Sequence, residues 1–193
     1  MAKPTPERTE MTTNTTPAIA GQIDTTRSGD QPLVSQTRIE IYTDGSCIGN
    51  PGHGGWGAVI LRKDAADKII KKIEISGMDP STTNIRMEMT AACAALEYLG
   101  QITEEPITLF CDANLIPNAM NGWLANWKAK GGKKAGGGVV RNPDLWERLE
   151  RAAEGRNVTW AWVRGHNGSE FNERADRLAY AGSRKAEKII KGY

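Results

Sequence analysis

The chain has 193 residues, of which 39% are hydrophobic and 25% are charged, a balance typical of one soluble domain with or without a tail. It excludes fibrous and mostly disordered proteins. No run approaches the roughly 18 apolar residues of a membrane-spanning helix, and the first residues lack the apolar stretch of a secretory signal. We therefore expect a cytoplasmic protein without membrane contact. The net charge of +2 is too small to indicate a nucleic-acid partner by itself.

The first 37 residues differ in composition from the rest. Thr, Pro, Ser, Gln and Asn dominate, no aromatic residue occurs, and the apolar positions show no helical or strand period. This predicts a flexible tail over residues 1–37 and a single domain over residues 38–193. The three cysteines, Cys47, Cys93 and Cys111, are odd in number and lack metal-ligand spacing, so we expect reduced, structural thiols.

Strands and helices alternate along the domain. The expected elements are strands at Arg38–Thr43, Gly57–Leu61 and Lys68–Ile75, a helix at Asn84–Leu99, a strand at Ile107–Cys111, helical segments at Leu115–Lys130 and Asp144–Ala153, a strand at Val158–Val163 and a helix at Asn172–Lys188. The first three strands are typical of an antiparallel meander, with a break after the first at Asp44-Gly45. The order predicts an α/β fold in which helices cover a mixed sheet.

Two aspartates follow predicted strands. Asp44 follows the first strand and Asp112 follows the apolar strand Leu109-Phe110-Cys111. Carboxyl ends of sheet strands are where α/β proteins collect functional groups, so both are candidate site residues. The plain alternatives are a turn at Asp44 and a helix N-cap at Asp112.

Glu88 lies on the apolar side of its predicted helix. The positions 4, 7, 8 and 11 residues later are Ala92, Ala95, Leu96 and Leu99, so the carboxylate falls on the stripe that faces the sheet. A buried, unpaired carboxylate costs several kcal/mol. Either Glu88 belongs to a functional site, or it pairs with Arg86 or Arg62 or interacts with the helix dipole.

Asp176 flanks the apolar face of the last predicted helix and by itself would be a solvated charge. If the two strand ends are neighbours and both helices cross them, four carboxylates converge: Asp44, Glu88, Asp112 and Asp176. Such a cluster needs cations to stay ionised. All-oxygen ligands suit Mg²⁺ or Mn²⁺, and a pair of these ions promotes displacement at phosphorus.

His166 lies in the glycine-flanked loop Arg164-Gly165-His166-Asn167-Gly168-Ser169. A loop imidazole beside a metal site is suited to proton transfer near neutral pH, whereas the alternative is a plain surface histidine. His53 has no comparable context, and we expect it at the surface.

A basic stretch lies near the middle of the chain. Its members, with no acidic residue between them, are Lys128, Lys130, Lys133, Lys134 and Arg141. Trp123 and Trp127 precede them at helical spacing. The combination predicts binding to a polyanion backbone. The alternatives are a solvated basic face and two tryptophans that pack inward.

These residues in this order resemble type 1 ribonuclease H over residues 38 to 185. The matching motifs are Thr43-Asp44-Gly45-Ser46, Gly49-Asn50-Pro51-Gly52, Thr83-Asn84 before Arg86-Met87-Glu88, Asp112, Trp123 with Trp127, Asp144-Leu145-Trp146, Gly165-His166, and Asn172-Glu173-Arg174-Ala175-Asp176. The resemblance implies the ribonuclease H-like fold: a five-stranded mixed sheet, three antiparallel strands then two parallel, flanked by helices.

The resemblance also implies an activity. The chain would be an endoribonuclease that hydrolyses the RNA strand of RNA/DNA hybrids and leaves 5′-phosphate and 3′-hydroxyl ends. Asp44, Glu88, Asp112 and Asp176 would hold two Mg²⁺ ions, with Mn²⁺ as an alternative, and His166 would assist proton transfer or product release. We expect a monomer. The expected contacts with the hybrid are Cys47, Asn50, Thr83, Asn84, Arg86, Trp123, Trp127, Lys128, Lys130, Lys133, Lys134 and Asn142.

Three departures from the family pattern affect substrate binding. Ile85 stands where a second asparagine is frequent, Ala113-Asn114-Leu115 replaces Ser-x-Tyr, and Ser81 occupies a position where an arginine often seats a DNA phosphate.

Two other classes of protein remain alternatives: another nuclease or strand-transfer enzyme of the same fold, and a non-catalytic module that binds hybrids. The four intact carboxylates argue against the non-catalytic module, because binding a polyanion gains nothing from acids.

Overall fold

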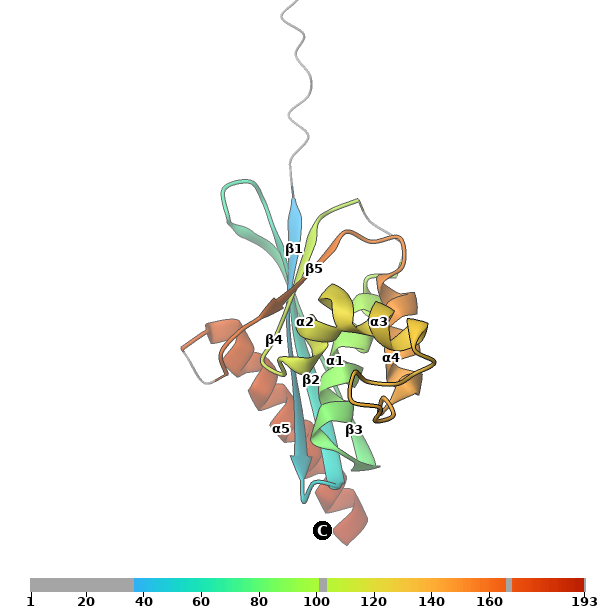
Figure 1. Ribbon diagram of the computed structural model, residues 1–193. Helices are drawn as coiled ribbons and strands as arrows, with labels where there is room; N and C mark the ends of the chain where they lie inside the picture. Colours follow the sequence, from blue (N-terminus) through green and yellow to red (C-terminus); the bar gives the residue numbers. More distant parts are fainter. Residues whose placement is uncertain (1–36, 101–103, 166–167, 193) are drawn as a thin grey trace, which may run out of the picture. The chain divides into compact units, whose positions relative to one another are not determined.

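The computed structural model describes residues 37–100, 104–165 and 168–192, and every statement about the fold refers to these residues. They contain one mixed sheet. Its strands are β1 (Arg38–Ile48), β2 (Gly52–Lys63), β3 (Ile69–Thr82), β4 (Ile107–Cys111) and β5 (Val158–Trp162). Their spatial order is β3-β2-β1-β4-β5, and Figure 1 shows the arrangement.

The sheet confirms the expected fold class. β1 and β2 pair antiparallel, as do β2 and β3, whereas β1 and β4, and β4 and β5, pair parallel. The five-stranded sheet therefore has three antiparallel strands followed by two parallel strands, with helices on both faces (Figure 1).

The helices divide between the two faces of the sheet. They are α1 (Asn84–Tyr98), α2 (Leu115–Asn118), α3 (Leu124–Ala129), α4 (Pro143–Ala153) and α5 (Glu170–Lys191), with a π-helical segment, Ala119–Trp123, between α2 and α3. On one face, buried Leu109 of β4 belongs to a large core with Leu96 of α1 and Leu149 of α4. On the other face, Leu61 of β2 packs with Ala175 of α5. Because successive side chains of a strand point to opposite faces of the sheet, a strand can contribute residues to both cores.

The first strand is longer than the sequence predicts. Asp44-Gly45 does not break it, because Gly45 to Ile48 continue to pair with β2, from Gly45 opposite Trp56 to Ile48 opposite His53. The expected strand end was wrong because Gly45 is accommodated inside the ladder rather than in a turn. Asp44 is therefore a strand residue, not a turn residue.

The helical region between residues 115 and 130 is also interrupted. Helical structure was expected there, and the structure has α2, the π-helical segment and α3 in succession. Gly122 leaves helical geometry, with φ 165° and ψ −31°, and lies within the π-helical segment between α2 and α3. Pro117 lies in the first turn of α2, as expected, where its missing N–H is tolerated.

The three cysteines are unpaired, as expected. Burial raises the pKa of the Cys93 thiol to about 12, and burial also raises the pKa of Cys111, so both remain protonated. Within the described part of the chain, no helix is both long enough and apolar enough to cross a membrane.

Candidate active site

The register of two parallel strands brings the two predicted aspartates together. Thr43 of β1 pairs with Cys111 of β4, so Asp44 and Asp112 both follow the same rung of the ladder. Thr43 is fully buried, and its hydroxyl donates to the carbonyl oxygen of Phe110 at 3.3 Å. These contacts fix the two strands against each other where β4 ends, so Asp44 of β1 and Asp112 directly after β4 are neighbours there.

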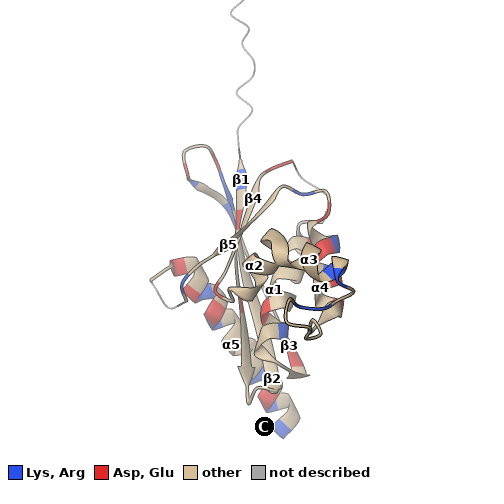
Figure 2. Cartoon of the chain, in the orientation of Figure 1, with Lys and Arg blue, Asp and Glu red and all other residues tan. Residues whose placement is uncertain are grey.

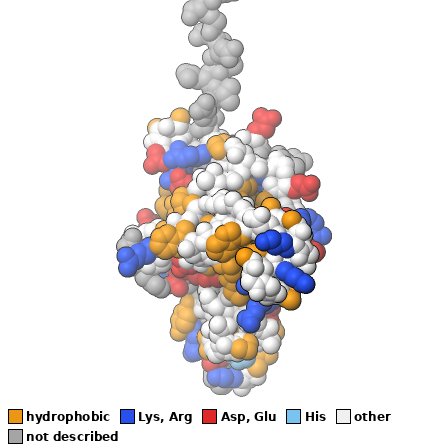
Figure 3. All heavy atoms as spheres, in the orientation of Figure 1, with side chains coloured by type: hydrophobic (Ala, Val, Ile, Leu, Met, Phe, Trp, Pro, Cys, Tyr) orange, Lys and Arg blue, Asp and Glu red, His pale blue; other side chains and the backbone are white. Residues whose placement is uncertain are grey.

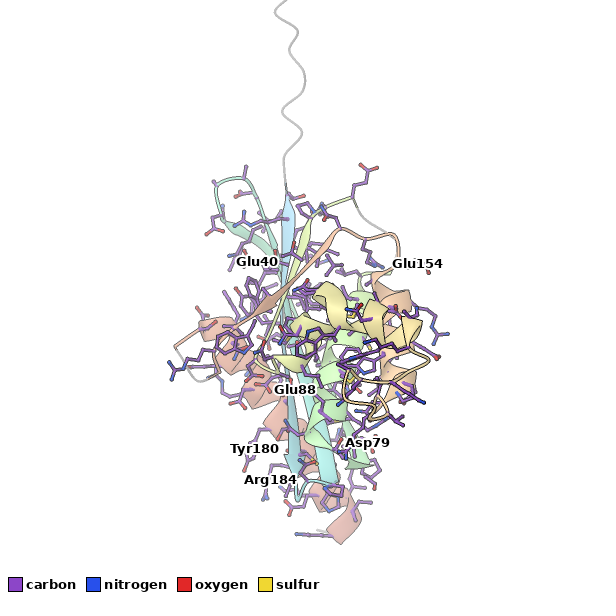
Figure 4. All side chains as sticks on the ribbon, in the orientation of Figure 1. Glu40, Asp79, Glu88, Glu154, Tyr180 and Arg184 are labelled. Carbon is purple, nitrogen blue, oxygen red and sulfur yellow. The ribbon has the colours of Figure 1, made fainter. Side chains whose placement is uncertain are left out.

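Glu88 reaches the same place from the first turns of α1. Its side chain is only 4% exposed, and Figure 4 shows it at the centre of the molecule between α1 and the sheet. The close approach depends on Gly45, because a Cβ atom there would lie 2.2 Å from the Glu88 nitrogen and 2.6 Å from the Met87 carbonyl carbon. Only glycine lets β1 and α1 come this near.

The three carboxylates form a compact cluster. One oxygen from each of Asp44, Glu88 and Asp112 lies within 4.8 Å of the other two. Asn84 donates to Glu88 Oε1 at 3.4 Å, whereas Glu88 Oε2 is buried and has no hydrogen-bond partner among the described residues. A buried oxygen without a donor is costly unless a cation satisfies it. The donor set therefore fits a hard divalent cation.

The electrostatics of the cluster agree with this fit. Burial, followed by repulsion from Asp112 and Asp176, raises the pKa of Asp44 to about 8. Burial, followed by repulsion from Asp44 and Asp112, raises the pKa of Glu88 well above its usual range. Without a cation, the site therefore holds protons near neutral pH. A divalent cation would replace those protons.

Asp176 lies on α5 and is partly exposed. It is not part of the close trio, but its charge contributes to the raised pKa of Asp44, which places it at the margin of the same site. The structure thus brings together three of the four predicted carboxylates closely and couples the fourth to them electrostatically.

Two alternatives for the acidic residues do not hold: an arginine partner for Glu88 and a helix N-cap at Asp112. Arg86 pairs with Asp144 at 2.7 Å and Arg62 pairs with Glu105 at 2.7 Å, so neither arginine serves Glu88. The residue that precedes α2 as its N-cap is Asn114, not Asp112.

His166 lies outside the described residues, so its expected role stays a prediction. Gly165, directly before it, is described: a Cβ atom on Gly165 would lie 2.6 Å from Asp112 Oδ2. Gly165 therefore lies close to the Asp112 carboxylate, with no room for a side chain between them. His53 is partly exposed, and its Nδ1 lies 2.9 Å from the Pro80 carbonyl oxygen.

Four expected substrate contacts lie together beside the cluster. Asn50 Oδ1 accepts from the Asn84 backbone N–H at 3.1 Å, and the Cys47 thiol lies 3.5 Å from the Thr82 carbonyl oxygen. Thr83 is the residue before α1 and makes no side-chain capping hydrogen bond there. The structure thus joins the turn after β1 to the start of α1, next to Glu88.

Arg86 and Asn142 form a second group at the start of α4. Arg86 Nη1 donates to Asn142 Oδ1 at 3.3 Å and to Asp144 Oδ1 at 3.1 Å, and its Nη2 donates to Asp144 Oδ2 at 2.7 Å. Asp144 was not among the predicted site residues. Its partner lies 58 positions away, so no local sequence signal indicates the pair.

The basic stretch combines exposed lysines with a partly buried tryptophan pair. Trp127 is 8% exposed and packs edge-on against Trp146, whereas Trp123 is 46% exposed. The two rings border a groove of about 450 Å³ that Lys130 and Lys134 also line. Lys128 pairs with Glu150 of α4 at 3.0 Å.

The basic side chains of this region gather on one side of the face drawn in Figure 3, and acidic side chains lie near its centre. Figure 2 shows the blue segments at α3 and in the loop after it. Lys133 and Val139 form an isolated bridge that closes this loop. Lys128 thus lies in the last turn of α3, whereas Lys130, Lys133 and Lys134 follow the helix and lie in the loop.

Trp162 is a further site residue that the sequence did not indicate. Its indole N–H donates to the Asp112 carbonyl oxygen at 3.0 Å, and its ring is 53% exposed. It supports the backbone of a cluster residue from the neighbouring strand. Its position at the end of β5, two residues after the core tryptophan Trp160, is the only sequence signal for this role.

The ribonuclease H family model matches residues 36–184. Ribonuclease H of Jannaschia sp. strain CCS1 is 47% identical over 144 residues, which cover 75% of this chain and 90% of that protein. Ribonuclease H of Francisella philomiragia is 49% identical over 147 residues, with coverage of 76% and 91%.

Two solved structures are similar as well. LC9-RNase H1, described as a type 1 RNase H with the type 2 active-site motif, superposes with a TM-score of 0.70 at 29% identity, covering 79% of this chain and 75% of that one. LC11-RNase H1 in complex with an RNA/DNA hybrid gives a TM-score of 0.56 at 28% identity, covering 77% of this chain and 99% of that one. With its fold, its carboxylate cluster and these relatives in agreement, the chain belongs to the ribonuclease H family, on its type 1 branch.

Proposed function

We infer that the chain is an endoribonuclease that hydrolyses the RNA strand of RNA/DNA hybrids. The observation that carries this conclusion is the cluster of Asp44, Glu88 and Asp112, in which Glu88 Oε2 is buried and has no hydrogen-bond partner within the described part of the chain. A site that only binds a polyanion would place basic groups here, because three clustered acids, two of them buried, repel phosphate. The arrangement suits cation-assisted displacement at phosphorus instead.

Two Mg²⁺ ions complete the proposed site, with Asp44, Glu88, Asp112 and Asp176 as their ligands. When bound, such ions offset the charge that develops on the reacting phosphate and make a water molecule a better nucleophile. The donor set supports this choice, because it consists of carboxylate oxygens, and the described residues contain no competing cysteine or histidine cluster.

The chain's own residues then have separate tasks. Asn84 holds Glu88 Oε1, which fixes the carboxylate on the side of the turn that carries Asn50. In the proposed reaction, the oxygen of water bonds to phosphorus and the bond to the ribose 3′-oxygen breaks. The products are a 5′-phosphate and a 3′-hydroxyl. His166 moves a proton to the leaving oxygen or from the attacking water.

RNA differs from DNA in its 2′-hydroxyl group, which can donate a hydrogen bond that the DNA strand cannot. Glu88 accepts this hydrogen bond in our proposal, and Asn50, Asn84 and the backbone around Cys47 contact the same strand. Thr83, Arg86, Asn142, the Trp123–Trp127 pair and the lysines of the basic stretch hold the rest of the hybrid.

The remaining parts of the proposal concern the state of the protein. We propose a monomer in the cytoplasm, with residues 1–37 as a tail beside a domain of residues 38–193. The three unpaired cysteines support a reducing compartment. Size-exclusion chromatography with light scattering tests the oligomeric state, and a mass near that of two chains would contradict it.

The test of the function is cleavage of end-labelled duplexes. RNA/DNA hybrid, RNA/RNA and DNA/DNA of one sequence are incubated with Mg²⁺, Mn²⁺, Ca²⁺ or a chelator. We expect cuts only in the RNA strand of the hybrid, with Mg²⁺ or Mn²⁺, and little cleavage with Ca²⁺, which is larger and holds a looser geometry. Asp112→Asn should bind the hybrid and cut almost none of it. Binding without cleavage by the wild type would favour the non-catalytic module.

A further inference from the structure

Arg86 joins α1 to the start of α4 through two side chains. Its guanidinium is bidentate with Asp144, at 3.1 and 2.7 Å, and Nη1 also donates to Asn142 Oδ1 at 3.3 Å. Asn142 holds a left-handed backbone conformation, φ 56° and ψ 51°, directly before Pro143, so its Cα position is tightly constrained. The freedom that remains is the orientation of its side-chain amide.

The charge of Arg86 is already matched. Both Asp144 oxygens accept from the guanidinium, and hydrogen bonding by Arg86 lowers the pKa of Asp144. The same pair raises the pKa of Arg86. An arginine held this way by a carboxylate has little net charge to offer a phosphate. Any contribution of Arg86 to the binding of a polyanion must therefore come from its contacts with residues other than Asp144.

The other contact is the amide of Asn142. Arginine has only donors, so the amide atom that faces it must be the oxygen. The amide nitrogen then points away and donates to the Met89 sulfur at 4.0 Å, a weak acceptor. Asn142 is partly exposed, so this N–H₂ group is available for a stronger acceptor from solution.

We propose that Arg86 is a positioning residue: it orients the Asn142 amide so that the N–H₂ group, not the carbonyl oxygen, faces a phosphate of the hybrid. If the amide turned over, its oxygen would meet the phosphate oxygens and repel them. This inference rests on the proposed hybrid substrate, and it assigns Arg86 an indirect role in place of direct contact. It also gives the Asp144 carboxylate a purpose, since Asp144 fixes the guanidinium plane.

The test removes the ion pair without changing the net charge. Arg86→Met combined with Asp144→Asn removes both charges, so no unmatched carboxylate is left to repel the hybrid. The matched control is Arg148→Met with Glu97→Gln, which removes a second bidentate pair between α1 and α4, at 2.7 and 2.6 Å. Arg86 and Arg148 are equally exposed, 36% for each side chain.

We expect the Arg86 pair variant to raise the KM for hybrid about tenfold, the scale of removing one hydrogen bond to a charged group. The single-turnover cleavage rate at saturation should change less than about twofold. The Arg148 pair variant should keep the wild-type KM. Melting temperatures of the two pair variants should be lowered to a similar extent. An equal rise of KM in both variants would mean that Arg86 only docks the helices, and this would overturn the proposal.

The decisive measurement is the combination with Asn142→Gly, which removes the amide and suits the left-handed backbone. If Arg86 acts through Asn142, adding the Arg86 pair variant to Asn142→Gly raises KM no further. If the two effects multiply, Arg86 contacts the phosphate itself and the proposal is wrong. A wild-type protein that neither binds nor cuts the hybrid would refute the proposed function before any variant is compared.

Discussion

Gly45 of β1 lies directly against the backbone of Glu88 at the start of α1. A Cβ atom at Gly45 would be 2.2 Å from the Glu88 nitrogen and 2.9 Å from its Cα. Both contacts are with backbone, which cannot rotate away as a side chain can. The two acids of the cluster that come from β1 and α1 are therefore held at their separation by the absence of one methyl group.

Gly45→Ala should therefore separate β1 from α1. We expect a loss of about 3 kcal/mol of stability, at the upper end for overpacking, and a drop of about 10²-fold in cleavage, the scale of a misplaced catalytic group. The measurements are thermal unfolding and single-turnover cleavage. Gly136→Ala is the control, because a Cβ atom there meets nothing within 4 Å. If both variants cleave at the same rate, the close approach is unimportant for the site.

The metal-free protein should lose stability as the pH rises. Asp44 has a pKa of about 8, and the pKa of Glu88 is also raised, whereas in the unfolded chain both have values near 4. The folded state therefore binds protons more tightly. The stability that this tighter proton binding gives to the folded state is present in full below about pH 4 and is lost as the pH rises towards 8.

Bound Mg²⁺ should reverse this loss, because it replaces the protons. We expect Mg²⁺ to raise the melting temperature more at pH 8 than at pH 5.5, where protons compete with it. Asp44→Asn removes one of the two groups and should make the metal-free melting temperature less dependent on pH between 5 and 8. An increase in metal-free stability across that range in the wild type would contradict the assigned shifts.

How far the sequence predicts this site depends on whether each residue carries a local signal. Glu88 does, because a carboxylate on an apolar helical stripe is anomalous, and the structure confirms its burial. Asp44 and Asp112 do, because each follows a strand predicted from the sequence, although only the parallel register shows that they are neighbours. The strand Ile107–Cys111 was predicted with both its ends, since its apolar run is short and bounded.

Other features depend on contacts between distant segments. Asp144 and Arg86 are 58 positions apart, and Lys128 and Glu150 are 22 apart, so no periodicity indicates either pair. The extension of β1 beyond Asp44 depends on its ladder with β2. A glycine that looks like a strand breaker in the sequence is kept inside the strand by its neighbours.

His166→Ala should slow cleavage by roughly 10²-fold or somewhat less, the contribution of a general acid or base, and far less than the loss of a cluster carboxylate. Single-turnover rates from pH 6 to 9 measure it, with His53→Ala as the control histidine. A rate for His166→Ala that equals the wild type across this range would make His166 an ordinary surface residue.

Deletion of residues 1–36 should leave the melting temperature and the cleavage rate nearly unchanged. The segment lacks apolar periodicity, and residues of this composition bury little surface. Thermal unfolding and hybrid cleavage of the shortened chain are compared with those of the full chain. A melting temperature lower by several degrees would show that the segment contributes to the folded domain.

The lysines of the basic stretch should act unequally. Lys128 pairs with Glu150 at 3.0 Å, whereas for Lys130, Lys133 and Lys134 the described residues offer no acidic partner, and all three are exposed. A phosphate can interact with the full charge of each of these three lysines, whereas it must displace Glu150 before it can pair with Lys128. We therefore expect replacement of Lys130, Lys133 and Lys134 by alanine to weaken hybrid binding more, per residue, than Lys128→Ala.

The salt dependence of binding separates phosphate binding from a solvated face. Removing one lysine that binds a phosphate should flatten the slope of log affinity against log salt by about 0.9, if the hybrid behaves as B-form DNA does. Saturated single-turnover rates should barely change, because the lysines bind the phosphates equally in the ground and transition states. The control is Lys185→Ala with Lys188→Ala, two exposed lysines of α5 on the opposite face of the sheet. Parallel slopes for the wild type and the triple variant would leave these lysines as solvated charges, and Trp123 and Trp127 would then serve only to pack α3 against α4.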